Sequence, residues 1–99
     1  MRLIFLLLFS TIINNLNAQD KVINGKVSDE NNEGLPGATI IIKGTTKGTV
    51  TDIEGNFQLD VDENDIIEIS FSGYEKQEIS VTGKNLFSIN LEPDVETLK

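Results

Sequence analysis

Apolar and polar residues alternate one by one in short runs along the chain, and this period of two is the feature that most limits the fold. In the clearest run, Phe57, Leu59 and Val61 are separated by single polar residues. Successive side chains of a β-strand point to opposite faces of a sheet, so such a run predicts a strand with one apolar side and one solvent-facing side. Similar runs lie at 23–27, 38–42, 48–52, 67–71, 78–81 and 87–91.

Turn-forming residues separate these runs, most clearly the asparagines and glycine of 31–34 and the Pro-Gly pair of 36–37. Several short strands with turns between them are typical of a small sandwich or barrel. No long window after residue 18 keeps the apolar spacing of an amphipathic helix. Because each strand has one polar face, two antiparallel sheets packed face to face would bury all the apolar sides. We therefore predict an all-β, seven-stranded β-sandwich.

Two local features of this sandwich follow from single residues. Gly55 lies between two of the runs and predicts a tight hairpin over 54–56, because glycine takes a positive φ without a Cβ clash. The alternation places Phe57 and Phe71 on the core side of their strands. We therefore expect Phe57→Ala or Phe71→Ala each to lower the free energy of unfolding by about 3–5 kcal/mol.

The first eighteen residues have the layout of a secretory signal peptide. Met1 and Arg2 give a short positive start, residues 3–13 are almost entirely apolar, and Ala18 offers a small residue for cleavage. The apolar run is much shorter than the roughly 20 residues that a membrane-spanning helix needs. We predict a signal peptide over residues 1–18 and hence an exported protein that does not span a membrane; a buried N-terminal helix is the alternative.

Composition removes most catalytic and many binding chemistries. The chain has no Cys and no His, which excludes disulfides, thiolate or imidazole metal ligands, cysteine nucleophiles and Ser-His-Asp triads. Its net charge is −8, and cleavage after Ala18 would remove Arg2 and no acid, lowering the charge to −9. Nucleic acids and anionic lipids bind to positive surfaces. We predict no enzymatic activity, no cofactor and no nucleic-acid partner.

One acidic stretch has part of the spacing of a calcium-binding loop. Asp60, Asp62 and Asn64 follow the Asp-x-Asp-x-Asn pattern, which places oxygen ligands on one side of a turn. The sixth position of the loop is Asp65 instead of Gly, and the twelfth is Phe71 instead of Glu. These two mismatches favour a solvated turn between strands, with a calcium site as the weaker hypothesis.

The stretches 23–29, 34–40 and 43–57, together with 71–74 and 91–92, form a distinctive pattern. This pattern closely resembles the carboxypeptidase regulatory-like domain, and more narrowly its version at the N-terminus of SusC-like TonB-dependent outer-membrane receptors of Bacteroidota. The resemblance implies a transthyretin-like Greek-key sandwich of seven strands with no catalytic residues. It also implies a place on the periplasmic side of the outer membrane and contacts with envelope proteins, such as the receptor's own plug and barrel or an associated lipoprotein, during uptake of glycans or peptides.

In the receptors that this chain resembles, a TonB box, a plug and a large barrel follow the domain. The sequence here ends at Lys99, so we expect a fragment or a truncated protein. The expected organisation is a signal peptide at 1–18, the sandwich domain at 19–92, and a polar tail or linker at 93–99. Two alternatives remain open: a free exported module that binds a surface glycan or protein, and an accessory domain of an exported peptidase.

Overall fold

The computed structural model describes residues 20–95, and the predicted signal peptide lies outside this range. The described chain contains seven strands and no α-helix, which confirms the predicted fold class. The strands are β1 (Asp20–Ser28), β2 (Thr39–Ile42), β3 (Gly48–Val50), β4 (Asn56–Asp62), β5 (Ile66–Ser70), β6 (Gln77–Ser80) and β7 (Leu86–Asn90).

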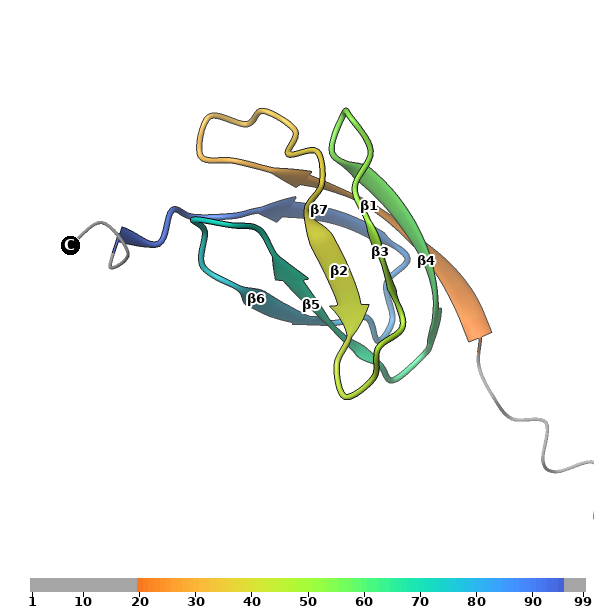
Figure 1. The fold of residues 1–99 in the computed structure, drawn as a ribbon. Helices are drawn as coiled ribbons and strands as arrows, with labels where there is room; N and C mark the ends of the chain where they lie inside the picture. Colours follow the sequence, from red (N-terminus) through yellow and green to blue (C-terminus); the bar gives the residue numbers. More distant parts are fainter. Residues whose placement is uncertain (1–19, 96–99) are drawn as a thin grey trace, which may run out of the picture.

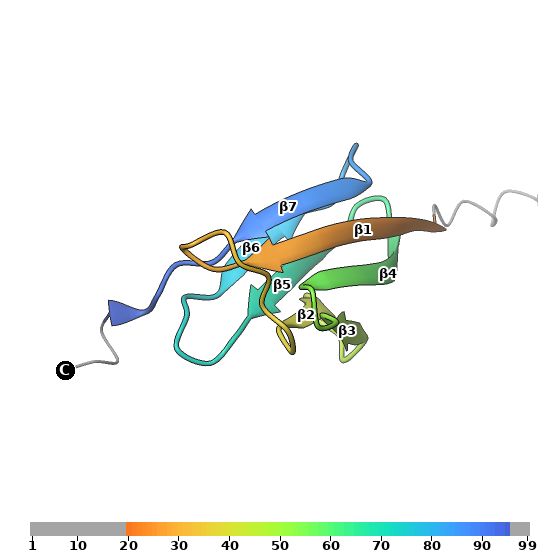
Figure 2. The same ribbon diagram turned by 90° about the horizontal axis from the view of Figure 1, so that it is seen from above.

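Two sheets pack face to face, one of three strands in the order β4-β1-β7 and one of four strands in the order β3-β2-β5-β6 (Figure 1). The same two layers are visible from above, with β1 and β7 running side by side (Figure 2). The core lies between the sheets, because the strands bury alternate residues as predicted. It comprises Ile23, Val27, Leu35, Ala38, Ile40, Ile42, Phe57, Leu59, Val61, Ile67, Ile69, Val81, Phe87, Ile89 and Leu91.

The pairing of the sheets differs from the prediction in one respect. All neighbouring strands are antiparallel except β1 and β7, which are parallel in the register Asn24↔Leu86 to Ser28↔Asn90. These two strands are the first and last of the domain. No short connection joins them, so nothing in the local sequence requires them to be antiparallel.

The predicted hairpin at 54–56 is also only half right. Gly55 has a φ of 88° and its amide donates to the Asp52 carbonyl at 2.9 Å, which closes the expected tight turn. However, β3 and β4 on either side of this turn lie in different sheets. The turn is therefore a crossing between layers, because β4 pairs with β1 instead of β3.

Phe71 is a third difference. It lies just beyond the end of β5 and is only partly buried, packed against Tyr74 with ring centroids 5.9 Å apart. Phe57, by contrast, is 5% exposed. The two phenylalanines are thus not equivalent parts of the core.

Two glycines allow the crossing turn to pack directly on the loop that follows β1. A Cβ added at Gly34 would lie 2.0 Å from the Glu54 carbonyl oxygen, and one added at Gly55 would lie 2.5 Å from the Val27 carbonyl oxygen. The backbone here is held by hydrogen bonds from the Val27 amide to the Gly55 carbonyl and from the Leu35 amide to the Val27 carbonyl. Only glycine fits at such a distance.

Candidate functional site

The segment that leaves the sandwich after β7, residues 91–95, is held at one end of the molecule; we name it the exit segment. Leu91 is fully buried, and its amide donates to the Ser28 carbonyl at 2.9 Å. Further along, the Glu75 amide donates to the Glu92 carbonyl, and the Asp94 amide donates to the Gly73 carbonyl, each at 2.9 Å. The loop between β5 and β6 therefore fixes the path of the chain as it leaves the domain.

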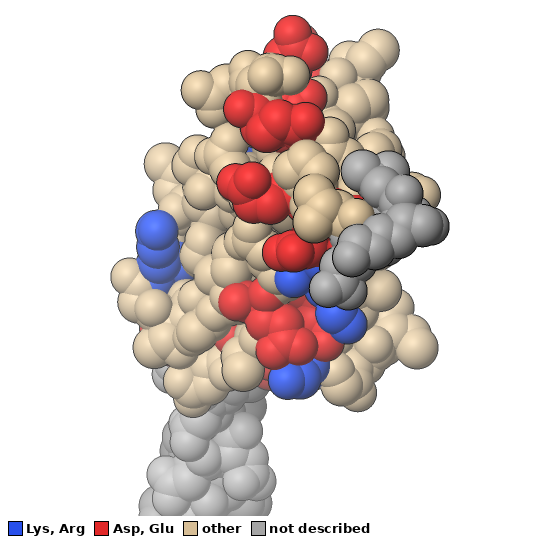
Figure 3. Space-filling model, turned by 90° about the vertical axis from the view of Figure 1, so that its left-hand side faces the viewer, with Lys and Arg blue, Asp and Glu red and all other residues tan. Residues whose placement is uncertain are grey.

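Acidic residues surround this exit segment, and we name the group the acidic end. Figure 3, which looks at the left-hand side of Figure 1, shows Asp and Glu side chains in a band along this face, with Lys side chains beside its lower part. Its members come from the β1–β2 loop, the β5–β6 loop and the exit segment: Asp29, Glu30, Glu33, Glu75, Glu92 and Asp94. The nearby Lys76 is directed to another carboxylate, since its Nζ lies 3.8 Å from Glu68 Oε1. The end thus presents concentrated negative charge.

Tyr74 is the one aromatic polar group at the acidic end. Its hydroxyl donates to Glu30 Oε1 at 3.1 Å, and its backbone forms a bridge with Pro93. Partial burial, followed by the hydrogen bond to the Glu30 carboxylate, raises the pKa of the Tyr74 hydroxyl above its usual value. Tyr74 therefore stays protonated and serves to join the β1–β2 loop to the exit segment.

The predicted calcium residues lie on the three-stranded sheet and the turn after it. Asp60 and Asp62 share the exposed face of β4, and Asn64 lies in the β4–β5 turn. Asp62 is paired across the sheet with Asp20, and the hydrogen bond between their side chains is the main cause that raises the pKa of Asp62. Within residues 20–95, no group of three or more His, Cys, Asp or Glu is arranged to hold a metal ion. A calcium site here remains a hypothesis.

The turn itself is closed by its own polar groups. The Asp62 amide donates to Asp65 Oδ2 at 2.8 Å, and the Asp65 amide donates to the Asp62 carbonyl at 3.0 Å. The Asp65 carboxylate is therefore used to hold the backbone of the β4–β5 turn. That role agrees with the solvated turn favoured by the sequence.

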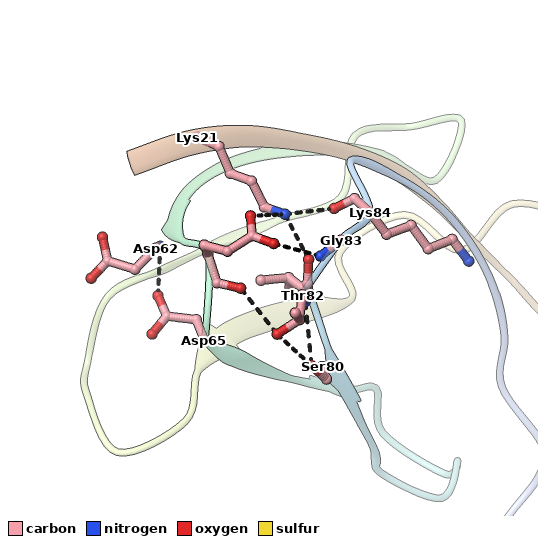
Figure 4. Close-up of polar contacts among 9 residues, drawn as sticks. Lys21, Asp62, Asp65, Ser80, Thr82, Gly83 and Lys84 are labelled. Atoms are coloured by element: carbon pink, nitrogen blue, oxygen red, sulfur yellow. Dashed lines mark hydrogen bonds and ion pairs between the residues drawn. The ribbon is translucent and has the colours of Figure 1, made fainter. Parts of the chain in front are cut away.

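Glu63, which the sequence did not single out, makes the most contacts of the acids in this turn, and Figure 4 labels its partners Lys21, Thr82 and Gly83. Its Oε1 lies 2.8 Å from Lys21 Nζ, and its Oε2 accepts a 2.6 Å hydrogen bond from the Gly83 amide. Its backbone carbonyl accepts a hydrogen bond from Thr82 Oγ1 at 3.1 Å. The Lys21 ammonium, and next the Gly83 amide, hold the pKa of Glu63 below its usual value.

Lys21 extends this contact to the start of the last strand. Its Nζ also donates to the carbonyls of Val81 at 2.7 Å and of Lys84 at 2.9 Å. Lys21, Glu63 and the turn at 80–84 thus form one polar cluster, which we name the Lys21 cluster. Its residues are far apart in the sequence, so no local motif could have indicated it.

One further polar residue is structural. Thr51 is 4% exposed; its Oγ1 donates to the Leu35 carbonyl and accepts a 2.9 Å hydrogen bond from the Ala38 amide. It therefore fixes the loop that contains the Pro36-Gly37 turn. Thr51, Glu63 and Lys21 therefore all use their side chains to hold backbone in place.

Comparisons with known proteins identify the family of this chain. The sequence pattern of the CarboxypepD_reg-like domain matches residues 23–99. The chain belongs to this family. The family assignment confirms the resemblance drawn from the sequence motifs, and the all-β sandwich agrees with it.

The curated relatives of this family member are TonB-dependent receptors. The chain is 43% identical over 81 residues to the TonB-dependent receptor SusC of Bacteroides thetaiotaomicron, covering 82% of this chain and 8% of that protein. Two TonB-dependent receptors of Formosa agariphila are 35% and 38% identical, each over 96% of this chain and 9% of the receptor. The chain thus spans less than a tenth of the length of these relatives.

A solved structure shares the fold. It is a chain of a type II cohesin–X-dockerin complex from Acetivibrio cellulolyticus, with a TM-score of 0.58 and 26% identity over 72% of this chain and 56% of that chain.

In residues 20–95 we find no helix long and apolar enough to cross a membrane.

Proposed function

We propose that this chain is the exported, non-catalytic N-terminal domain of a SusC-like TonB-dependent outer-membrane receptor, one domain of a longer protein. It lies on the periplasmic side and acts through contacts with envelope proteins, either the rest of its own receptor or an associated lipoprotein. The observation that supports this most strongly is the 43% identity to SusC over 82% of the chain. That match covers only 8% of SusC, which supports the proposal that this chain is a single domain of a larger receptor.

The chemistry of the described residues supports a role without catalysis. Thr51 and Glu63 use their side chains to hold backbone, and Lys43 and Glu78 form a surface ion pair of 3.0 Å. An active site normally holds a group whose pKa is matched to proton transfer near neutral pH, and the chain has no His to supply one. The acidic end and the anchored exit segment suit a module that presents a fixed surface to a neighbouring protein.

An immunoblot on fractionated cells tests the receptor assignment. An antibody raised against residues 20–95 should detect a band much larger than a 99-residue chain in the outer-membrane fraction. A band of the chain's own size in the soluble periplasm would instead indicate a free module. A band confined to the cytoplasm would contradict export altogether.

The reading frame downstream of the Lys99 codon separates the alternatives in a second way. A frame that continues into plug and barrel sequence supports the receptor. A terminator at that point supports the free module, and a continuation into a peptidase supports the accessory domain.

A further inference from the structure

The first and last strands of the domain are neighbours and run in the same direction. β1 begins at Asp20 and β7 ends at Asn90, and the two are hydrogen-bonded in parallel. Both views show the chain entering at one end of this pair and leaving at the other (Figures 1 and 2). A force that separates the two ends of the described chain therefore acts along the strands, sliding β7 past β1.

This direction of force is the one that a strand pair resists best. In a parallel pair such as β1–β7 the hydrogen bonds are evenly spaced and run slantwise from one strand to the other. Force along the axis loads all bonds of the pair at once, whereas force across the axis breaks them one after another. The β1–β7 register covers five residue pairs, and it is bounded by the bonds from the Asn24 amide to the Asn85 carbonyl and from the Leu91 amide to the Ser28 carbonyl.

The strand that would have to slide is held on its other side as well. β1 is the central strand of its sheet and also pairs with β4, from Asp20↔Asp62 to Lys26↔Asn56. Its inward residues Ile23 and Val27 are fully buried. Moving β1 along its axis would therefore break both ladders and displace core side chains together.

Both ends of the pair carry additional ties. At the entry end, Lys21 bonds the carbonyls of Val81 and Lys84 just before β7. At the exit end, Asn90 Nδ2 donates to the Asp29 carbonyl at 3.3 Å, and Gln77 Nε2 donates to the Asn90 carbonyl at 2.6 Å. The exit segment is bonded to the β5–β6 loop beyond that point.

We propose that the parallel β1–β7 pair is a shear clamp, which keeps this domain folded when the polypeptide that follows residue 95 is pulled away along the strands. The proposal concerns the mechanics of the sandwich itself. It goes beyond the receptor assignment and does not depend on it.

Single-molecule pulling on the 99-residue chain in two directions tests the clamp. The chain has no cysteine, so introduced pairs give unique attachment points. Asp20→Cys with Val95→Cys pulls along β1 and β7, while Gln58→Cys with Ser88→Cys pulls across the same sheet from its two edge strands. All four positions are exposed. At one loading rate, the axial pair should unfold at a force at least about twofold higher, because forced unfolding reports the barrier along the direction of pull.

Urea unfolding of both double variants provides the matched control, since a comparison is made only between proteins of equal equilibrium stability. If the Ser88 variant is destabilised, Leu86→Cys, which is 71% exposed on the same strand, replaces it. A force ratio of about two or more between variants of equal stability supports the clamp. Any smaller ratio, or a higher force across the strands, overturns it.

Discussion

At the residue scale, Gly34 is the glycine at which an added Cβ would come closest to neighbouring backbone. A Cβ there would lie 2.0 Å from the Glu54 carbonyl oxygen, so Gly34→Ala must push the β1–β2 loop away from the crossing turn. We expect this substitution to lower the free energy of unfolding by more than about 3 kcal/mol in urea melts.

Gly73→Ala is the matched control for this substitution. Gly73 has a φ of 87° and no atom within 4 Å of its added Cβ, so only the backbone conformation is penalised. That penalty is about 1–2 kcal/mol. Equal losses at the two glycines would contradict a role for the close approach.

Thr51 gives a second prediction for a single side chain. Thr51→Val keeps the shape but leaves the Ala38 amide and the Leu35 carbonyl without their buried partner. We expect a loss of about 1–3 kcal/mol by urea unfolding. Thr46→Val, at an exposed position, should change stability by less than about 0.5 kcal/mol. A similar loss at both threonines would mean that the Thr51 hydroxyl is not important.

At the element scale, each strand could be located from the sequence because alternation is local. β4 has the burial pattern that Phe57, Leu59 and Val61 predict. Which strands pair is not local information. The turn at Gly55 looked like a hairpin, and its own hydrogen bonds are those of a tight turn, yet β4 pairs with the distant β1. The acidic stretch shows the same limit, since the partners of Glu63, Lys21 before it and Gly83 after it, are both distant in the sequence.

The different places of Phe57 and Phe71 in their elements change the expected cost of truncation. Phe57→Ala should lower the free energy of unfolding by about 3–5 kcal/mol, because the ring is buried between the sheets and against Gly25. Phe71→Ala should cost clearly less, since that ring lies past the end of β5 and is only partly buried. Urea melts of both variants provide the measurement. Equal losses would show that Phe71 belongs to the core after all.

The Lys21 cluster joins β1, the β4–β5 turn and the β6–β7 turn, and its contribution should depend on pH. The folded state lowers the pKa of Glu63, so its stabilising effect is complete above the ordinary value of 4.5 and is lost as the pH falls through the folded pKa. Glu63→Gln should therefore lower the urea midpoint at pH 7.

The gap between the wild-type and Glu63→Gln midpoints should then narrow as the pH is lowered below 4.5. Glu54→Gln, at an exposed acid in the crossing turn, is the control for the general effect of removing a charge. A gap that stays constant down to acid pH would show that the ionised carboxylate of Glu63 is not what stabilises the cluster.

At the scale of the whole molecule, the two layers could be predicted from the sequence, but the pairing of the first strand with the last could not. Seven half-polar strands can bury their apolar sides between two facing sheets, and the alternation of the sequence favours such an arrangement. The parallel pair of β1 and β7 completes the three-stranded sheet, although most of the sequence lies between these two strands. Their pairing depends on how the intervening strands distribute between the sheets, which no short motif records.

The net charge of −8 is also a property of the whole molecule, and it predicts a response to salt. The chain has 16 acidic and 8 basic residues, so repulsion among the acids, most of all at the acidic end, opposes the compact state. Raising sodium chloride from about 10 mM to about 500 mM shortens the Debye length from about 30 Å to a few ångströms. We expect the urea midpoint at pH 7 to rise, with a smaller rise for a variant that carries Glu30→Gln and Glu33→Gln. A midpoint that falls with salt would mean that ion pairs outweigh the repulsion.

The entry and exit of the described chain at opposite ends of the β1–β7 pair have a consequence for anything joined to this domain. A nine-residue strand such as β1 is about 30 Å long. A protein attached before Asp20 and another attached after Val95 would therefore be kept apart by a stiff spacer of roughly that length, instead of meeting on one side.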